Sequence, residues 1–305
     1  MKALVVHAYG EPETYAVEEV PVPHAGPGQI QVRIEAASLN AVDLRLARGG
    51  FRTLVDLPFP HVPGNDFAGT ITETGAGVTA YTIGDLVFGH GVARAMAGFL
   101  ALPKPSLTTG AIAEYAVFEA DTPFIARRPK NLDTGVAAAL PTAGLTTRAL
   151  LARAKIRPGE RVLLIGATGG VGTTLLPELE ADVIATGRPG DETILRELGA
   201  SEVIGYDDYP TDVDVVINAV LPGDHLTEAA KSLKPGGRLY TITFPAPVTG
   251  RNDIHPEMVL DTSVEMRATI GLRPTIGRRY SLDEAARAMV DFARAHTVGK
   301  LVVAV

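Results

Sequence analysis

The sequence contains no cysteine. This absence excludes disulfide bonds, thiolate metal sites and a cysteine nucleophile, so any redox chemistry has to come from a bound cofactor. Basic clusters are also missing. The net charge of -7 therefore argues against nucleic acid as a partner, because phosphates require a basic surface. No apolar run approaches the roughly 20 residues of a membrane span, and the start, MKALVVHAYG, lacks the pattern of a signal peptide. We expect a cytoplasmic protein without membrane or nucleic-acid contacts.

The composition indicates a well-buried α/β protein with more than one domain. The chain has 305 residues, which is more than one hydrophobic core usually organises, and 46% of them are hydrophobic. Short alternating runs between Pro/Gly clusters predict a β-rich, barrel-like domain over the first 120 or so residues. From about Arg157, apolar strands alternate with helical segments, a pattern typical of a doubly wound parallel sheet.

The second half of the chain has readable element boundaries. We predict strands at 161–165, 183–186, 202–204, 213–217 and 238–242, and helices near 171–180, 191–198 and 224–233. Asp191 and Asp224 are candidate N-caps, and Gly199 is a helix stop. A capping box at residues 281–284 starts a helix to about Ala295, and the strand at 300–305 is expected to return to the first domain. The apolar insertion at 93–109 is either a lid or a packed loop.

A glycine-rich turn, GATGGVG at residues 166–172, follows the apolar strand at 161–165 and precedes a helix. Glycines let the backbone approach a pyrophosphate, and a helix N-terminus offers N–H groups and partial positive charge to its oxygens. An ordinary tight turn would carry similar glycines. Placed within a strand–helix–strand pattern, the turn favours dinucleotide binding.

The end of the next strand indicates which dinucleotide is bound. NAD-selective proteins usually carry a carboxylate there for the ribose 2′-hydroxyl, whereas this chain reads Thr186-Gly187-Arg188. A guanidinium suits a 2′-phosphate, so Arg188, helped by Thr186, predicts NADPH as the cofactor. The alternative is a solvated loop arginine. The missing acid also counts against an S-adenosylmethionine methyltransferase.

Motifs along nearly the whole chain resemble those of one family. They are ASLNAVD (37–43), PGNDFAG (63–69), VTAYTIGDLVFG (78–89), GAIAEY (110–115), GLTT (144–147), GATGGVG (166–172), LGA (198–200), LKPGGR (233–238) and GK (299–300). The sequence resembles the medium-chain dehydrogenase/reductase superfamily, in its zinc-free quinone oxidoreductase branch. The resemblance implies a GroES-like β-barrel catalytic domain at 1–125, completed by 266–305, and a Rossmann domain at 126–265.

The resemblance also explains why no metal is expected. Zinc-dependent relatives place a Cys where Asn40 stands and a His where Asn65 stands, and neutral amides cannot replace those zinc donors. None of the seven histidines forms the close cluster of a metal site, and most are expected to be structural. Asp66, near the former metal position, is expected to have a structural hydrogen-bonding role.

Three features depart from the family pattern. The first Rossmann helix is about one turn short and contains Pro177, so we expect it to be kinked, short or shifted. The tyrosine that several relatives carry after the N-x-x-D motif is missing, which leaves no obvious proton donor. The region between Phe244 and Gly271 is shorter than usual, which leaves the sixth strand and a dimer edge uncertain.

The resemblance also implies roles for individual residues. Thr142 and Thr146 would lie near the nicotinamide, and Asn40 would face its ring, although Asn40 and Asp43 are equally typical of a helix cap and turn. Tyr206 would flank the 2′-phosphate beside Arg188. The remaining cofactor contacts would be the pyrophosphate residues Thr168, Gly169, Gly170 and Val171 and, toward the nicotinamide ribose and ring, Asn218, Ala219, Thr243 and Phe244.

These features together predict an enzyme that transfers hydride from NADPH to a small-molecule quinone or α,β-unsaturated carbonyl compound, without zinc. Positioning and electrostatics can supply several kcal/mol of the barrier without a dedicated acid or base. The alternative is an NADPH-binding protein with little turnover, in a structural, sensing or regulatory role. A homodimer formed by edge pairing of Rossmann sheets is also implied by the resemblance.

Overall fold

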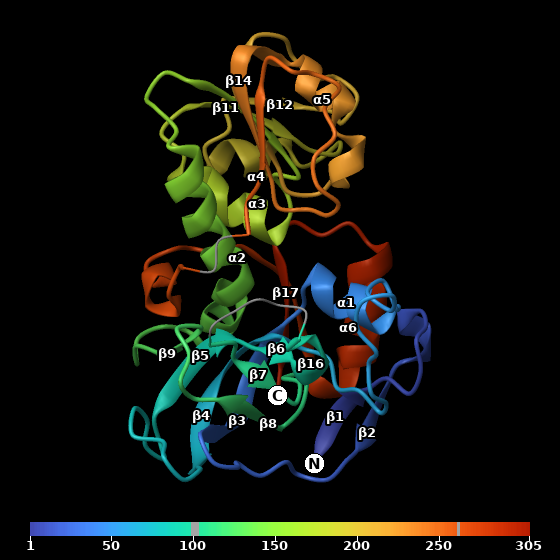
Figure 1. Cartoon of the computed structure of the whole chain (residues 1–305), viewed down its shortest axis with the longest axis vertical. Helices are drawn as coiled ribbons and strands as arrows, with labels where there is room; N and C mark the ends of the chain where they lie inside the picture. The colour runs from blue at the N-terminus through green and yellow to red at the C-terminus, as the bar shows by residue number, and fades with distance from the viewer. Residues whose placement is uncertain (99–103, 261–262) are drawn as a thin grey trace. The chain divides into compact units, whose positions relative to one another are not determined.

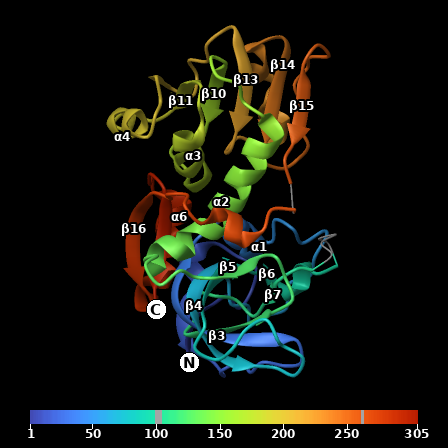
Figure 2. The ribbon, with the colours of Figure 1, turned by 90° about the vertical axis from the view of Figure 1, so that its left-hand side faces the viewer.

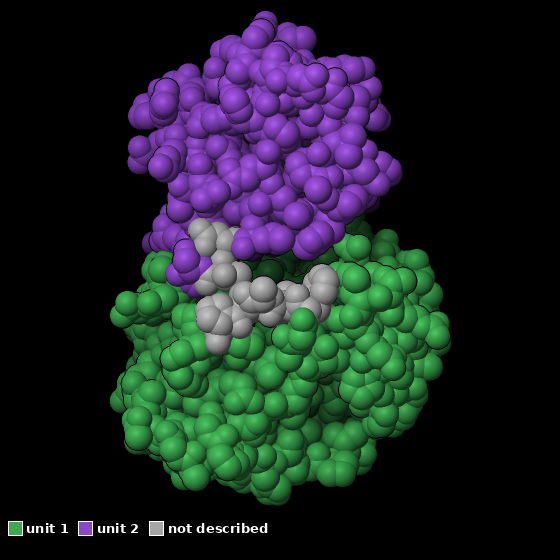
Figure 3. All heavy atoms as spheres, viewed as in Figure 1, with its two compact units in different colours: residues 1–142, 265–271, 276–305 green, residues 143–264, 272–275 purple. Residues whose placement is uncertain are grey.

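The computed structural model describes residues 1–98, 104–260 and 263–305, and the chain divides into two compact units. Unit 1 comprises Met1–Thr142, Glu265–Gly271 and Ile276–Val305, and unit 2 comprises Ala143–Val264 and Leu272–Thr275 (Figure 3). The long helix α2 (Thr134–Ala154) contributes residues to both units. Both chain ends belong to unit 1 (Figure 1).

Unit 1 is built on a mixed sheet around β3 (Gln29–Ser38), which pairs antiparallel with β4, β8 and β17. Most residues of β3 and the first four of β4 are buried, so these strands form part of the core of the unit. The other strands of the unit are β1 (Lys2–Val5), β2 (Ala16–Glu19), β4 (Asp66–Thr74), β5 (Leu86–His90), β6 (Val92–Ala93), β7 (Leu107–Thr108), β8 (Tyr115–Glu119), β9 (Ile125–Arg127), β16 (Ile276–Ser281) and β17 (Lys300–Ala304).

The C-terminal segment completes this sheet. The capping box is confirmed, because the backbone N–H and hydroxyl of Ser281 both donate to the Glu284 carboxylate. Helix α6 (Ala285–Arg294) follows and ends where the sequence predicts. Strand β17 then pairs with β3, which confirms that the last strand returns to the first part of the chain. The short helix α1 (Ala41–Ala47) connects β3 to the loop before β4.

The insertion at 93–109 lies partly outside the described residues. Its described ends contain a 3-10 helix, Arg94–Met96, and β7, and the buried residues Val92, Ala93 and Met96 belong to a small apolar cluster. Residues 99–103 are not described, so neither the lid nor the packed loop is decided.

Unit 2 contains a six-stranded parallel sheet with the order β12-β11-β10-β13-β14-β15. Figure 2 labels five of these strands, from β11 to β15, side by side in this order. This order is the doubly wound Rossmann arrangement, which confirms the predicted fold of this half. The strands are β10 (Arg161–Ile165), β11 (Asp182–Thr186), β12 (Glu202–Ile204), β13 (Val213–Asn218), β14 (Leu233–Thr241) and β15 (His255–Met258). The sixth strand left uncertain by the sequence is therefore present, and it pairs with β14 at one edge.

The helices of unit 2 are short. They are α3 (Gly170–Leu175), α4 (Glu192–Glu197) and α5 (Thr227–Lys231). Apolar residues of α2, α3 and α4 pack on one face of the sheet, and those of α5 pack on the other. Helix α3 ends before Pro177, which lies in a 3-10 turn, as the missing proline N–H requires.

Of the two predicted N-caps of unit 2, Asp191 is confirmed in position and Asp224 is wrong. Asp224 lies inside a 3-10 helix, Gly223–His225, and Leu226 occupies the N-cap position of α5. Asp191 occupies the N-cap position of α4 but makes no capping bond. Its carboxylate instead accepts from the backbone N–H of Arg188, 2.7 Å away, because the turn between β11 and α4 presents that donor first. Gly199 does end α4, with a positive φ of 113°.

Candidate functional site

The turn after β10 is packed so closely that two of its glycines are required. A Cβ at Gly172 would lie 2.3 Å from the carbonyl oxygen of Gly166, and Gly166 itself has a φ of 85°. Gly169 is the N-cap of α3, and its N–H donates to the Gly166 carbonyl at 3.1 Å. The first-turn N–H groups of a helix have no acceptor within the helix. These groups therefore face the end of the turn, where an anion can accept from them.

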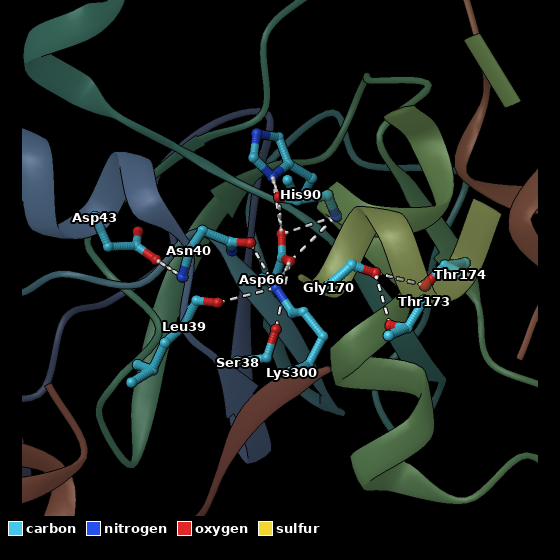
Figure 4. Close-up of polar contacts among 11 residues, drawn as sticks. Ser38, Leu39, Asn40, Asp43, Asp66, His90, Gly170, Thr173, Thr174 and Lys300 are labelled. Atoms are coloured by element: carbon cyan, nitrogen blue, oxygen red, sulfur yellow. Dashed lines mark hydrogen bonds and ion pairs between the residues drawn. The ribbon is translucent and has the colours of Figure 1, made fainter. Parts of the chain in front are cut away.

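Two threonine side chains of α3 form hydrogen bonds to the backbone at the start of this helix. Thr173 donates to the Gly169 carbonyl at 3.0 Å. Thr174 donates to the Gly170 carbonyl at 2.8 Å, and Thr173 lies 3.4 Å from the same oxygen (Figure 4). Thr168 is buried, whereas Gly169 is exposed and Val171 is half-buried. The exposed part of this turn is thus backbone rather than side chain.

Thr186 does not have the role that the sequence suggested for it. Its side chain is fully buried, and its hydroxyl accepts from the N–H of Gly166 at 2.9 Å. It therefore fixes the glycine turn to the end of β11 and cannot reach a 2′-phosphate.

Arg188 remains available for an anion. Its side chain is exposed, and it makes no ion pair within the parts of the chain that the structure describes. Tyr206, which follows β12, is half-buried and lines a hollow of about 450 Å³ together with Tyr209, Leu221 and His225. Arg188 and Tyr206 both follow the carboxyl ends of parallel strands, the edge at which doubly wound sheets bind ligands.

Asn218, at the carboxyl end of β13, holds together the next turn. Its amide donates to Thr243 at 3.1 Å and to the Leu221 carbonyl at 2.8 Å, and its Oδ1 accepts from the N–H of Leu221 at 2.9 Å. The Thr243 hydroxyl also donates to the Leu221 carbonyl. Ala219 is half-buried and Phe244 is 37% exposed. The structure thus brings Asn218 and Thr243 together, with Ala219 and Phe244 next to them in sequence.

Unit 1 contains a buried polar cluster that includes Asn40 and Thr142. Its centre is Asp66, which has no exposed surface and begins β4 (Figure 4). The Lys300 ammonium, also buried, donates to the Leu39 carbonyl at 3.0 Å, to Asn40 Oδ1 and, at 3.4 Å, to Asp66. The sequence pointed to Lys300 only as part of the GK motif. Its position at the start of an otherwise apolar strand was the available signal.

The opposite side of Asp66 is held by α2 and β5. Pro141 lies inside α2 and interrupts its hydrogen bonding, and the next N–H, that of Thr142, donates to both Asp66 oxygens at 3.1 and 3.2 Å. The Thr142 hydroxyl donates to Asp66 at 2.7 Å, and His90 Nδ1 lies 2.9 Å from the same oxygen. Asp66 therefore has the hydrogen-bonding role predicted for it, but His90 belongs to this cluster, which the sequence did not indicate.

The two buried carboxyl groups of this region differ in charge. Burial alone would raise the pKa of Asp66, but the Lys300 ammonium and the His90 bond outweigh it and lower that pKa to about 2. Burial, followed by repulsion from Asp66, raises the pKa of Asp43 to about 7. Asp43 still accepts from the N–H of Asn40 at 2.9 Å, at the start of α1. The cluster therefore holds one firmly ionised carboxylate beside one that is partly protonated near neutral pH.

A metal ion does not fit this cluster. The buried Lys300 ammonium already donates to Asn40 Oδ1, so a divalent cation bound there would be repelled by this positive charge. Within the described ranges, no group of three or more His, Cys, Asp or Glu side chains is arranged to hold a metal. No helix in those ranges has both the length and the apolar character needed to cross a bilayer.

Comparisons with known proteins match most of the chain. Residues 26–129 match the model of the alcohol dehydrogenase GroES-like domain, and residues 198–303 match that of the zinc-binding dehydrogenase family. The NADPH-dependent alkenal/one oxidoreductase of Arabidopsis thaliana is 32% identical over 254 residues, which are 80% of this chain and 62% of that protein. The quinone oxidoreductase of Mus musculus is 28% identical over 98% of this chain and 96% of its own length.

Solved structures agree with this match. The quinone oxidoreductase from Coxiella burnetii superposes with a TM-score of 0.83 at 27% identity, and the alignment covers 100% of this chain and 99% of that one. The agreement extends over both units, and it confirms the predicted combination of a GroES-like domain with a parallel dinucleotide-binding sheet.

Proposed function

Because the chain belongs to the medium-chain dehydrogenase/reductase superfamily, in its quinone oxidoreductase-like branch, we propose that it is an NADPH-dependent reductase of quinones or α,β-unsaturated carbonyl compounds. The names of two relatives support these substrate classes, an alkenal/one oxidoreductase and a quinone oxidoreductase. The observation that carries the proposal is the closely packed glycine turn, together with Arg188 after the next strand, which is exposed and has no ion pair to the described residues.

The residues of unit 2 fit NADPH. The N–H groups at the start of α3 would donate to the pyrophosphate oxygens, which would lie in the turn formed by Thr168, Gly169, Gly170 and Val171. Arg188 would pair with the 2′-phosphate, and Tyr206 would border it. The Asn218 and Thr243 side chains already form hydrogen bonds within their own turn. We therefore expect the backbone at Ala219 and Phe244, rather than these side chains, to contact the nicotinamide ribose and ring.

The cluster of unit 1 supplies groups for the substrate side. NADPH, when bound, supplies the hydride. Among the residues that the structure describes, Asn40 Nδ2 is buried without a hydrogen-bond partner. Lys300, which can only donate, identifies the oxygen of this amide and therefore also its nitrogen. An unpaired buried donor is costly unless a ligand accepts from it. We assign Asn40 Nδ2 to a carbonyl oxygen of the substrate or of the nicotinamide amide, with Thr142 and Thr146 beside the ring.

The experiment measures NADPH oxidation by absorbance at 340 nm with a panel of quinones beside a panel of enones, and with NADH as the alternative donor. Replacement of Arg188 by serine is expected to raise KM for NADPH about 10- to 100-fold, the equivalent of a lost charge-assisted pair, and to leave KM for NADH unchanged. Arg157→Ser is the matched control, because Arg157 is exposed and precedes β10 at the opposite ends of the strands.

Two results would contradict the proposal. If Arg188→Ser leaves KM for NADPH unaltered, the assignment of Arg188 to the 2′-phosphate of NADPH is wrong. Tight NADPH binding without oxidation by any quinone or enone would instead favour a sensing or regulatory protein.

We also propose that the chain forms a homodimer through β15, the edge strand next to β14, because an edge strand presents unpaired N–H and C=O groups to a second copy. Light scattering after size-exclusion chromatography checks this, and a monomer at micromolar concentration would contradict it. The cytoplasmic location expected from the sequence remains a prediction.

A further inference from the structure

His90 stands at the edge of the buried cluster and has no role in the function proposed above. It is the last residue of β5, and antiparallel pairing with β4 sets it directly opposite Asp66. Its Nδ1 lies 2.9 Å from the Asp66 carboxylate and 3.1 Å from the Thr142 hydroxyl. The side chain is 21% exposed, in contrast to Asp66, which is fully buried.

These contacts determine which nitrogen of His90 carries a proton. Asp66 is ionised and can only accept, and the Thr142 hydroxyl already donates to the same carboxylate oxygen. The 2.9 Å contact therefore requires a proton on His90 Nδ1. The other nitrogen, Nε2, makes no hydrogen bond to any part of the chain that the structure describes. Asp66 thus orients the ring in the way that a buried carboxylate orients a catalytic imidazole.

The charges around His90 come from four elements. Asp66 on β4 provides a fixed negative charge, and Lys300 on β17 provides a positive charge on the far side of that carboxylate. Asp43 on α1 also faces this cluster, and Thr142 on α2 contributes a neutral hydroxyl. The nearest charge to the ring is therefore the Asp66 carboxylate, which lies on its Nδ1 side.

We propose that His90 is the proton donor that completes substrate reduction, through its Nε2–H. This inference rests on the proposed function. Hydride addition at the β-carbon of an enone leaves an enolate and oxidised NADP⁺. The His90 imidazolium then gives its Nε2 proton to the α-carbon: the Nε2–H bond breaks and a new C–H bond forms. The imidazole that remains is neutral, and its Nδ1–H still donates to the Asp66 carboxylate. Solvent restores the Nε2 proton through the exposed edge of the ring. With a quinone, the same proton goes to the reduced oxygen.

His90 supplies the chemistry that the missing tyrosine would otherwise leave unassigned. A positioned acid contributes on the order of 10²- to 10⁴-fold to such a step. Thr142 and Asp66 hold His90 by groups of the same unit, so the arrangement exists without cofactor or substrate.

The test replaces His90 by glutamine, which keeps a polar side chain but cannot act as an acid. With an enone substrate, kcat is expected to fall at least about 100-fold, while KM for NADPH stays within a factor of two. In deuterated water the wild-type product should carry deuterium on one face of the α-carbon, and the variant product on both faces. His24→Gln is the matched control, because His24 forms a surface histidine–carboxylate pair with Glu73, 2.8 Å apart, in the same unit.

A second readout does not depend on turnover. Nitrogen-15 NMR of histidine-labelled wild-type protein should show one imidazole with a persistent Nδ1 proton, and this signal should be absent from His90→Gln. If the variant keeps wild-type kcat and one-sided deuteration, or if His90 proves to lack the Nδ1 proton, the inference is wrong. If wild-type protein oxidises no NADPH with either class of acceptor, the proposed function fails first, and this inference falls with it.

Discussion

Replacing Lys300 by methionine tests whether the buried ammonium keeps Asp66 ionised. Methionine is similarly long and unbranched, so the change removes charge and hydrogen bonds more than volume. The pKa of Asp66 is held at about 2 against an ordinary value of 3.8, a difference equivalent to about 2.5 kcal/mol. Loss of one partner from a buried ion pair typically costs about 3–5 kcal/mol, because the other charge stays buried without compensation.

The sign of the pH dependence follows from the two pKa values of Asp66. In the wild type, the folded pKa lies below the unfolded value, so the stabilisation is present above about pH 4 and is lost as pH falls through about 2. In Lys300→Met, the largest interaction that opposes burial is lost while the His90 bond remains, so the folded pKa of Asp66 rises, and the variant loses stability relative to the wild type as pH rises through that value. The free energy of unfolding that the variant loses relative to the wild type should therefore be smaller at pH 4.5 than at pH 8.

Hydrogen exchange is the suitable assay, because a chain with two compact units need not unfold in one step. Amides of β4 and β17 should lose protection by about 10²- to 10³-fold at pH 8, after correction for intrinsic exchange. Lys2→Met is the control, since Lys2 pairs with Asp283 on the surface of the same unit and its loss should leave these amides unchanged. Wild-type protection in Lys300→Met, or a deficit independent of pH, would refute this account of the cluster.

Two further substitutions test neighbouring parts of the reasoning. Burial and Asp66 raise the folded pKa of Asp43 to about 7, so the stability that protonated Asp43 contributes is lost as pH rises from about 4 through 7. Asp43→Asn should therefore reduce the fall in unfolding free energy over this pH range by up to about 4 kcal/mol. Melting temperatures at pH 5.5 and 8 check this, and equal slopes for both proteins would contradict it. Gly172→Ala should destabilise unit 2 by about 1–3 kcal/mol or more and weaken NADPH binding, because its Cβ would lie 2.3 Å from a backbone oxygen. Gly98→Ala, where a Cβ meets open space, is the matched control for melting and for nucleotide titration.

Local pattern determined much of unit 2. The runs at 161–165 and 202–204 became β10 and β12 with the predicted bounds. For β10 the reason is that an apolar strand buried in a parallel sheet needs little beyond its own side chains. The glycine turn was readable for the same reason, since close backbone approach requires glycine at a fixed spacing. Pro177 shortened α3 as expected, because a missing N–H acts wherever the chain lies.

Tertiary structure decided which polar groups meet. The predicted N-cap at Asp224 is wrong because α5 starts later in the chain, and Asp191 holds the predicted N-cap position of α4 but accepts from the N–H of Arg188 instead of from the helix. Thr186 looked suited to a phosphate in sequence, but the folded chain turns its hydroxyl toward Gly166. Each of these residues had more than one suitable partner, and only the packing selected one.

The cluster of unit 1 shows the same limit most clearly. Asn40, Asp66, His90 and Lys300 come from four separate segments, and Lys300 lies more than 200 residues from Asp66. The sequence alone predicted a glycine turn suited to a nucleotide, and its resemblance to one family indicated that the usual zinc donors are replaced. Strand register then placed His90 opposite Asp66, and the return of β17 to β3 brought Lys300 to Asp66 and Asn40. Residue type fixes what a side chain can donate or accept, but long-range strand pairing decides which partner it reaches.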